Sequence, residues 1–344
     1  MQTKTWRARA AAATLLTAHL SVALATTFEV KEMPVIEPPT TDPYHRPREI
    51  DASGRILVNV QDRRHQQVFF LSERCRPERC RRITPRGYST SWASMNAAGQ
   101  MAGEVWIDGT SWAARHDPSA GEAYLTQGAA RGINASGVVV GNTLDLHPFV
   151  YGTRLQWIPM PGDRQGIAAA INDQGVVVGH FFDADAHQRA FVNRDGTTKE
   201  LLPDAPRYTD STATDINGAG IAVGCAQASP GQAQMAVRFE AGAVVTLGEL
   251  VSGTRSGTCA QAVNESGRLV VGYSGVDPLD ATKLHGFVHD GTTMRDLNQL
   301  LRAEDAGRYT IYSAVDVNNA GQIAAQAIRV SDGAWVAVRL EPIP

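Results

Sequence analysis

Short apolar segments alternate with polar turns along most of this chain, and one arrangement returns seven times. An apolar residue precedes Asn-x-x-Gly, and a run such as VVVG, IAVG or LVVG follows in the clearest copies. An Asn side chain can bond to backbone N–H groups of its own turn, and Gly in the fourth place accepts a positive φ. The pattern therefore predicts hairpin corners between short strands, in which the Asn residues are structural. The turns are 51–54, 96–99, 134–137, 172–175, 217–220, 264–267 and 318–321, with Asp51 in the Asn place of the first.

A third apolar segment follows each turn, and a fourth follows it in most repeats. The third reads HPFV, RAFV, MAVR, HGFV or VAVR at 147–150, 189–192, 235–238, 285–288 and 336–339, and more loosely WAAR at 112–115 and QVFF at 67–70. The fourth reads TTKELLP or TTMRDLNQLL in two of the repeats. Four short antiparallel strands in roughly 45 residues are the size and content of one β-propeller blade. The sequence thus predicts an all-β fold, a β-propeller.

The two ends of the repeat region complement each other. The last repeat stops after its third strand, and the segment 27–36, TFEVKEMPVI, precedes the first turn and has the form of a fourth strand. Placing this segment beside the last repeat would complete that blade and remove two exposed sheet edges. We therefore predict seven blades of four short antiparallel strands, closed by the N-terminal strand, with six or eight blades as the alternatives.

The repeat resembles that of the HAF-type extracellular repeat proteins of bacteria, A-x-x-I-N-x-x-G-x-V-V-G followed by H-A-F. The first half matches at 131–141, 169–179, 214–224 and 261–272, and HPF at 147–149 and HGF at 285–287 come close to the second half. The resemblance covers nearly all of the chain beyond residue 25. It implies export and a β-propeller-like fold, and no defined reaction.

The first 25 residues have the pattern of a signal peptide. Lys4, Arg7 and Arg9 precede an apolar run, and Ala23-Leu24-Ala25 offers a small-x-small cleavage site. We expect residues 26–344 to form a single exported domain, periplasmic or extracellular, and no later run is apolar and long enough to span a membrane. Cleavage after residue 25 would remove three positive charges and no negative ones, so the formal net charge would change from −3 to −6. This acidity argues against nucleic acid or an anionic membrane as the partner, and we expect a monomer.

Four cysteines are an even count for an oxidising compartment. Pairing Cys75 with Cys80 and Cys225 with Cys259 is the simplest of three connectivities, because Pro77 can turn the chain between the first two. Zinc binding is the rival interpretation. It is weak, because a single C-x4-C has no matching pair of ligands.

Known catalytic motifs are missing from the sequence. It has no G-x-S-x-G elbow, phosphate loop, dinucleotide fingerprint or H-E-x-x-H, and we predict no cofactor. The densest group of metal-binding residue types is His180, Asp183, Asp185 and His187, in the segment after one repeat's second strand. These residues are the candidates for a divalent cation, and a polar loop tip is the alternative.

A positive segment, RCRPERCRRITPR, stands out in this acidic chain. Its arginines could bind an anionic glycan, a lipid head group or an acidic protein, and the alternative is a solvated hairpin tip. The candidate binding residues are Arg76, Arg79, Arg81 and Arg82, with Arg74 and Arg86 in the same segment.

Three classes of function follow. The first is a binding module whose loops hold a protein or glycan partner in the bacterial envelope. The second is an enzyme, a hydrolase or lyase, whose residues are scattered one per blade around the centre of the ring. The third is a structural envelope protein without a small ligand. We favour the binding module. Carboxylates with displaced pKa values near the centre would favour the enzyme.

Overall fold

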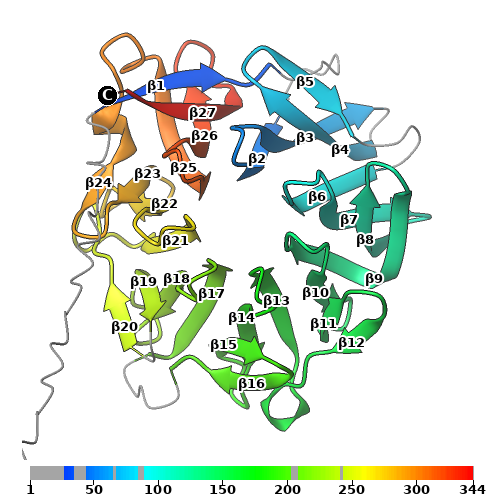
Figure 1. Ribbon diagram of the computed structural model, residues 1–344. Coiled ribbons are helices and arrows are strands. Elements are labelled where there is room, and N and C mark those ends of the chain that lie inside the picture. The colour runs from blue at the N-terminus through cyan, green and yellow to red at the C-terminus, as the bar shows by residue number, and fades with distance from the viewer. Residues whose placement is uncertain are drawn as a thin grey trace, which may run out of the picture.

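The computed structural model describes residues 27–34, 44–64, 67–83, 89–202, 208–240 and 243–343. Those residues form 27 β-strands and two short 3-10 helices and contain no α-helix. The strands build six antiparallel sheets, arranged in a ring around one axis (Figure 1). The fold is therefore all-β and β-propeller-like, as predicted. The expected signal peptide lies outside the described residues.

The strands follow the predicted repeats. The first repeat contains β2 (Tyr44–Ile50), β3 (Ile56–Arg64), β4 (Gln67–Arg76) and β5 (Arg79–Arg82). The second and third contain β6 (Ser89–Met95), β7 (Met101–Ile107), β8 (Thr110–Asp117), β9 (Gly121–Ile133), β10 (Val139–Thr143), β11 (Pro148–Tyr151), β12 (Leu155–Trp157) and η1 (Pro161–Asp163). The fourth and fifth contain β13 (Gly166–Ile171), β14 (Val177–Phe182), β15 (Gln188–Arg194), β16 (Thr197–Glu200), β17 (Asp210–Ile216), β18 (Ala222–Gln227), β19 (Met235–Glu240) and β20 (Ala243–Thr246). The sixth and seventh contain β21 (Thr258–Val263), β22 (Val270–Gly275), β23 (Leu284–His289), β24 (Met294–Asp296), η2 (Leu297–Leu300), β25 (Tyr309–Val317), β26 (Ile323–Arg329) and β27 (Trp335–Ile343).

Two details depart from a plain series of four-stranded sheets. The second and third repeats share the long strand β9, whose first half pairs with β8 and whose second half pairs with β10, so they form one seven-stranded sheet. The predicted strand 292–301 ends after β24, because Asp296 accepts a bond from the backbone N–H of Asn298 and starts η2. Leu297 and Leu300 of that helix are buried.

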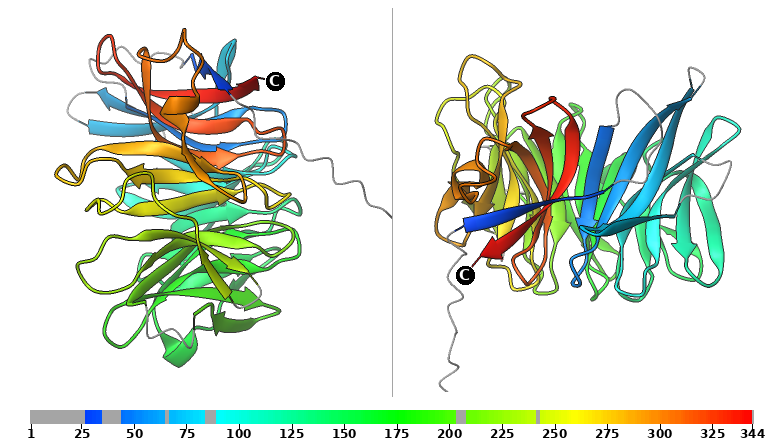
Figure 2. Two further views of the ribbon diagram at one scale, coloured as in Figure 1. Left: turned by 90° about the vertical axis from the view of Figure 1, so that its left-hand side faces the viewer. Right: turned by 90° about the horizontal axis from the view of Figure 1, so that it is seen from above.

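The N-terminal strand completes the last sheet, as predicted. β1 (Thr27–Glu32) pairs antiparallel with β27, from Thr27 opposite Ile343 to Glu32 opposite Val338 (Figures 1 and 2). The buried carboxylate of Asp305 accepts a bond from the backbone N–H of Val30 at 2.8 Å. The start and the end of the described chain are thus held together in one four-stranded sheet.

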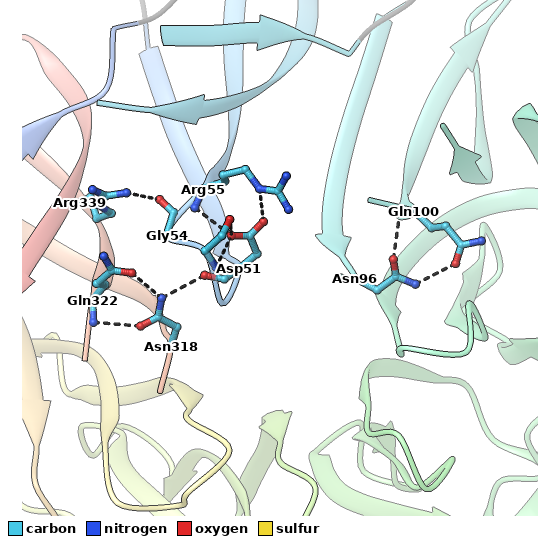
Figure 3. A network of polar contacts seen from close by, with 9 residues as sticks. Asp51, Gly54, Arg55, Asn96, Gln100, Asn318, Gln322 and Arg339 are labelled. Atoms are coloured by element: carbon cyan, nitrogen blue, oxygen red, sulfur yellow. Dashed lines mark hydrogen bonds and ion pairs between the residues drawn. The ribbon is translucent and has the colours of Figure 1, made fainter. Parts of the chain in front are cut away.

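All seven predicted turns form, and five of the six anchoring Asn residues also join neighbouring repeats. The Asn172 Oδ1 atom accepts the N–H of Val176 at 2.9 Å, while its Nδ2 donates to the carbonyl of Asn217 in the next repeat at 3.0 Å. Asn96, Asn134 and Asn217 bond to the next turn in the same way. Asn318 donates to the carbonyl of Asp51 at 3.0 Å, which joins the last repeat to the first (Figure 3).

Third-strand arginines add a second connection between repeats. Arg115 and Arg238, which end the WAAR and MAVR segments, donate to the carbonyls of Gly137 and Gly267 in the following turns at 3.1 and 2.9 Å. Arg339 of the VAVR segment donates to the carbonyl of Gly54 (Figure 3). The third-strand signature therefore holds the next turn in place, and the last arginine again connects the end of the chain with the first repeat.

The glycine that ends VVVG, IAVG and LVVG is required by a β-bulge. Each first strand shifts register three residues before its Asn or Asp anchor. In the fourth repeat the bulge brings the carbonyl oxygen of Ile167 so close that a Cβ on Gly179 would lie 1.9 Å from it. Equivalent contacts exist at Gly103, Gly141, Gly224 and Gly272.

Both predicted disulfides are present. Cys75–Cys80 joins β4 to β5 within the outer hairpin of the first repeat. Cys225–Cys259 joins β18 to β21 and so crosslinks two neighbouring sheets. The core lies between adjacent sheets in separate apolar clusters, of which one contains Val178 of β14 together with Ala213 and Ile216 of β17. Contacts between neighbouring repeats therefore hold the ring together.

Candidate functional site

Four arginine side chains share one face of the outer hairpin of the first repeat. In the register of β4 and β5, Arg74 stands opposite Arg81 and Arg76 opposite Arg79. Directly opposed residues, and residues two apart along a strand, point to the same side of a sheet. These four side chains, here called the arginine face, therefore stand on one side of the hairpin. The guanidinium group of Arg74 lies against Gly99 in the turn of the second repeat, 3.0 Å from where a Cβ would be. Arg76, Arg79 and Arg81 are exposed and Arg74 is half-buried, and none of them has a hydrogen bond or ion pair within the described residues.

The opposite side of this hairpin is anchored in the core. Cys75 alternates with the arginines and is fully buried among apolar side chains that include Ile56 and Ala337. Burial lowers the pKa of Arg74, and the positive charge of Arg55 lowers it further. The arginine face thus projects from a crosslinked base. Of the other sequence candidates, the side chain of Arg82 and all of residue 86 lie outside what the structure describes.

The candidate metal residues are used in a turn and in a contact between repeats. The Asp183 Oδ1 atom accepts the backbone N–H groups of Asp185 and His187, each at 3.0 Å. The His187 Nδ1 atom lies 3.3 Å from a carboxylate oxygen of Asp210 in the next repeat. His180, predicted to lie in the same loop, is part of β14. Among the described residues, no three His, Cys, Asp or Glu side chains are placed to hold a metal ion.

Three carboxylates stand on first strands, close to the axis of the ring, two residues before the turn anchor. The Asp215 Oδ2 atom accepts the N–H of Val263 in the next repeat at 2.9 Å. The Asp316 Oδ2 atom accepts the N–H of Ile50 at 2.8 Å, and Glu49 accepts the N–H of the following repeat's Met95. The same bond thus recurs across three of the junctions between repeats.

These carboxylates have displaced pKa values. Burial raises the pKa of Asp316 to about 7, with a further contribution from the negative charge of Asp215. Burial also raises the pKa of Glu49 well above its usual range, and the adjacent Asp316 raises it further. The pKa of Asp215 is raised by burial against the effect of two backbone N–H donors. Glu49 and Asp316 therefore form a pair that retains a proton under conditions in which an exposed carboxylate has lost it.

Removal of Asp316 should change how stability depends on pH. An acid whose pKa is raised by folding stabilises the fold below its unfolded pKa, and this contribution is lost as pH rises through the folded value. We therefore expect the melting temperature of the native chain to fall relative to that of Asp316→Asn between pH 4 and pH 7. His45 and His180, whose pKa values burial lowers to about 4, have the opposite effect in both proteins. A difference in melting temperature between the two proteins that stays constant from pH 4 to pH 7 would contradict a raised pKa for Asp316.

In three repeats, the first residue of the third-strand segment contacts the fourth strand. His147 makes a ring contact with Trp157, and the other two residues form ion pairs. His285 Nδ1 lies 2.8 Å from the Asp296 carboxylate, and Arg189, in the equivalent place of the fourth repeat, donates to Glu200 at 2.6 Å. In both repeats the acid stands opposite the motif phenylalanine. This places the motif's polar residue in sheet structure rather than in a binding site.

The residues near the axis were missed by sequence reasoning. Glu49, Asp215 and Asp316 each precede an anchor by two residues, where other repeats carry Ser, Gly or Ala. Alignment of the seven turns would have shown these charged exceptions. No single repeat contains a recognisable motif, because the residues meet only when the ring forms.

Comparisons with known proteins do not supply a family. No family model matches the chain, and no curated protein matches it significantly. Among solved structures it is similar to a puromycin-hydrolysing peptidase of Mycobacterium tuberculosis (10% identity, TM-score 0.47, 89% of this chain and 58% of that one). It is also similar to Trypanosoma rangeli sialidase in complex with sialic acid (9%, 0.44, 93% and 59%) and to Penicillium chrysogenum α-L-arabinanase complexed with arabinobiose (11%, 0.38, 93% and 99%). The chain spans about three fifths of the first two proteins. At these TM-scores, no activity is inferred from the likeness.

Proposed function

We propose that this chain is an exported seven-bladed β-propeller of the HAF type that acts as a monomeric binding module in the bacterial envelope. The seven turns and the division of β9 between two sets of strands support the number of blades. The pairing of β1 with β27 supports closure of the ring. The two disulfides support an oxidising compartment, in which such bonds persist.

The proposed partner is an acidic polysaccharide bound on the arginine face. One observation carries this proposal: the exposed side chains of Arg76, Arg79 and Arg81 stand on one face with no hydrogen bond or ion pair within the described residues. Guanidinium groups bind carboxylate, sulfate and phosphate oxygens in a planar, bidentate manner. An acidic polymer offers such groups in succession, as a folded protein surface rarely does.

The spacing of these arginines fits a repeating ligand. Opposed side chains in an antiparallel pair have Cβ atoms about 5 Å apart, so Arg76 and Arg79 can hold one acidic group together. Residues two apart along a strand are separated by about 6.7 Å, so Arg81 can hold the next group along the chain. The face is thus matched to a linear glycan with acidic groups on neighbouring sugars.

Replacement of Arg76 and Arg79 by Ala should weaken binding of dextran sulfate at least tenfold, since two of the three exposed arginines of the face are lost. The slope of the logarithm of the affinity against the logarithm of the salt concentration should also become smaller in magnitude by about two, because about two fewer counterions are released on binding. Biolayer interferometry with dextran sulfate, and with uncharged dextran of equal length, measures both effects.

A matched variant controls for total charge. Arg154 and Arg194 are exposed and lie in other repeats, so Arg154→Ala/Arg194→Ala removes the same charge at a distance from the face. This variant should bind dextran sulfate like the native chain. Equal losses in the two double variants, or unchanged binding in Arg76→Ala/Arg79→Ala, would contradict the proposed face.

A second candidate function is a hydrolase or lyase acting near the ring axis. The observation that favours it is the coupled pair of Glu49 and Asp316, because a carboxyl group with a pKa near 7 can serve as a general acid or base. Shortening of a uronate polymer by the native chain, and its loss in Glu49→Gln, would support this function. A polymer that keeps its length on size-exclusion chromatography would leave the binding module as the function.

A further inference from the structure

The bulge on each first strand places one special side chain per repeat near the axis of the ring. The residue that is skipped in the pairing stands three before the anchor in all seven strands. The seven residues are Arg48, Ala93, Arg131, Ala169, Thr214, Gln261 and Val315. Two of them are charged, and both are arginines.

The contacts of two of these side chains, Thr214 and Arg131, show where they lie. The Thr214 hydroxyl lies 2.9 Å from the carbonyl of Ala260 in the next repeat and 3.1 Å from that of Val223. Thr214 thus contacts both its own repeat and the following one, whereas Arg131 bonds within its own repeat, to Asn142 on β10. Arg48 and Arg131 hold the equivalent bulge position on β2 and β9, two innermost strands that lie on the same side of the axis with β6 between them (Figure 1).

Arg48 has no fixed partner there. It is exposed although it belongs to an innermost strand, and it has no hydrogen bond or ion pair within the described residues. Arg131 is half-buried, and its Nε donates to the Asn142 side chain at 2.7 Å, which fixes the guanidinium group. Although the Arg48 side chain is open to solvent, the protein that surrounds it inside the ring lowers its pKa, and the positive charges of Arg131 and then Arg46 are the next largest causes. The two guanidinium groups therefore repel each other.

The nearby acids do not neutralise this charge. Glu104 of β7 attracts both arginines, and its carboxylate accepts a bond from Ser111 at 2.8 Å. Glu49 follows Arg48 directly, but burial and Asp316 favour its neutral form. Two guanidinium groups thus share one acid, and a positive charge remains at the centre of the ring.

The geometry points to an anion site at the ring axis, in which Arg48 and Arg131 together hold a compact oxyanion: a carboxylate, sulfate or phosphate group. Arg131, fixed by Asn142, supplies a preorganised donor, and Arg48 supplies the mobile one. This site is separate from the arginine face, because its arginines come from innermost strands whereas β4 and β5 form the outer hairpin (Figure 1).

The test uses Arg76→Ala/Arg79→Ala as the parent protein, so that sulfate binding to the arginine face is weakened. Sodium sulfate at constant ionic strength should raise the melting temperature of the parent, as expected for a ligand of the folded state. Addition of Arg48→Gln should weaken sulfate binding at least tenfold, and Arg48→Lys should retain part of it. Isothermal titration calorimetry gives the dissociation constants.

A second measurement separates ligand binding from a structural role of Arg48. Because Arg48 and Arg131 repel each other, Arg48→Gln without sulfate should melt at the same temperature as the parent or higher. A lower melting temperature would mean that Arg48 stabilises the fold, and sulfate binding unaffected by Arg48→Gln would also overturn the proposal. Both outcomes are independent of dextran sulfate binding, so the axis site and the arginine face can fail separately.

Discussion

Gly179→Ala should destabilise the chain by about 2–4 kcal/mol, because the added methyl group has no space in the native backbone. Its Cβ would lie 1.9 Å from the carbonyl oxygen of Ile167 and 3.0 Å from the carbonyl carbon of the same residue. Both atoms belong to the backbone at the bulge, so relief requires the bulge itself to move. Since the bulge lies at the ring centre, where β13 packs against its neighbours, this movement would disturb both adjacent repeats. The midpoint of urea unfolding measures the loss.

Gly196→Ala is the matched control for this prediction. Gly196 has a φ of +76° and a Cβ would meet nothing within 4 Å, so only the left-handed backbone conformation opposes the substitution. That conformation costs an alanine about 1 kcal/mol. If Gly196→Ala destabilises the chain as much as Gly179→Ala, backbone conformation rather than the close contact explains the glycine of the repeat.

The repeat was sufficient to predict an all-β, propeller-like fold, because its residues specify turns and strands locally. Asn-x-x-Gly specifies a turn through one side chain and one φ value, and alternation of apolar residues specifies the strands on either side. The pairing of β1 with β27 was predictable for a different reason, since an unpaired segment at one end matched a missing strand at the other. The cysteine pairing followed from strand ends that a hairpin or a neighbouring repeat brings together.

The contacts between repeats were not predictable from one repeat. In four of the turns, the Nδ2 atom of the anchoring Asn donates to a carbonyl 38 to 47 residues further along the chain. No local sequence pattern reveals such a contact. The same holds for Glu49 and Asp316, which come from the first and seventh repeats and are brought together only where the last repeat contacts the first. In contrast, the residues of the arginine face could be identified from the sequence. They are neighbours in sequence, and the register of one hairpin was enough to assemble them.

Asn172→Asp should destabilise the chain by about 2–4 kcal/mol, because the connection between repeats needs a donor as well as an acceptor. Asn172 is 5% exposed, and its Nδ2 donates to the carbonyl of Asn217 at 3.0 Å. Aspartate keeps the bond from Val176 but places a carboxylate oxygen against that carbonyl. The new acid is expected to have a raised pKa, so the loss should grow as pH rises above 5. Melting temperatures of both proteins from pH 4.5 to pH 8 measure this effect.

Asp51→Asn makes the reverse change at the one turn that already has an acid. Hydrogen bonds from Arg55 and Ser53 outweigh burial and lower the pKa of Asp51, so this carboxylate is matched to its surroundings. Asparagine would keep the acceptor, lose the charge opposite Arg55 and gain a donor toward the second repeat, and we expect a net change within about 1 kcal/mol. A loss in Asp51→Asn equal to that in Asn172→Asp would mean that the turn alone, rather than the bond to the next repeat, determines the energetic value of the anchor. The outcome decides whether the repeated Asn is a feature of seven separate hairpins or of the ring as a whole.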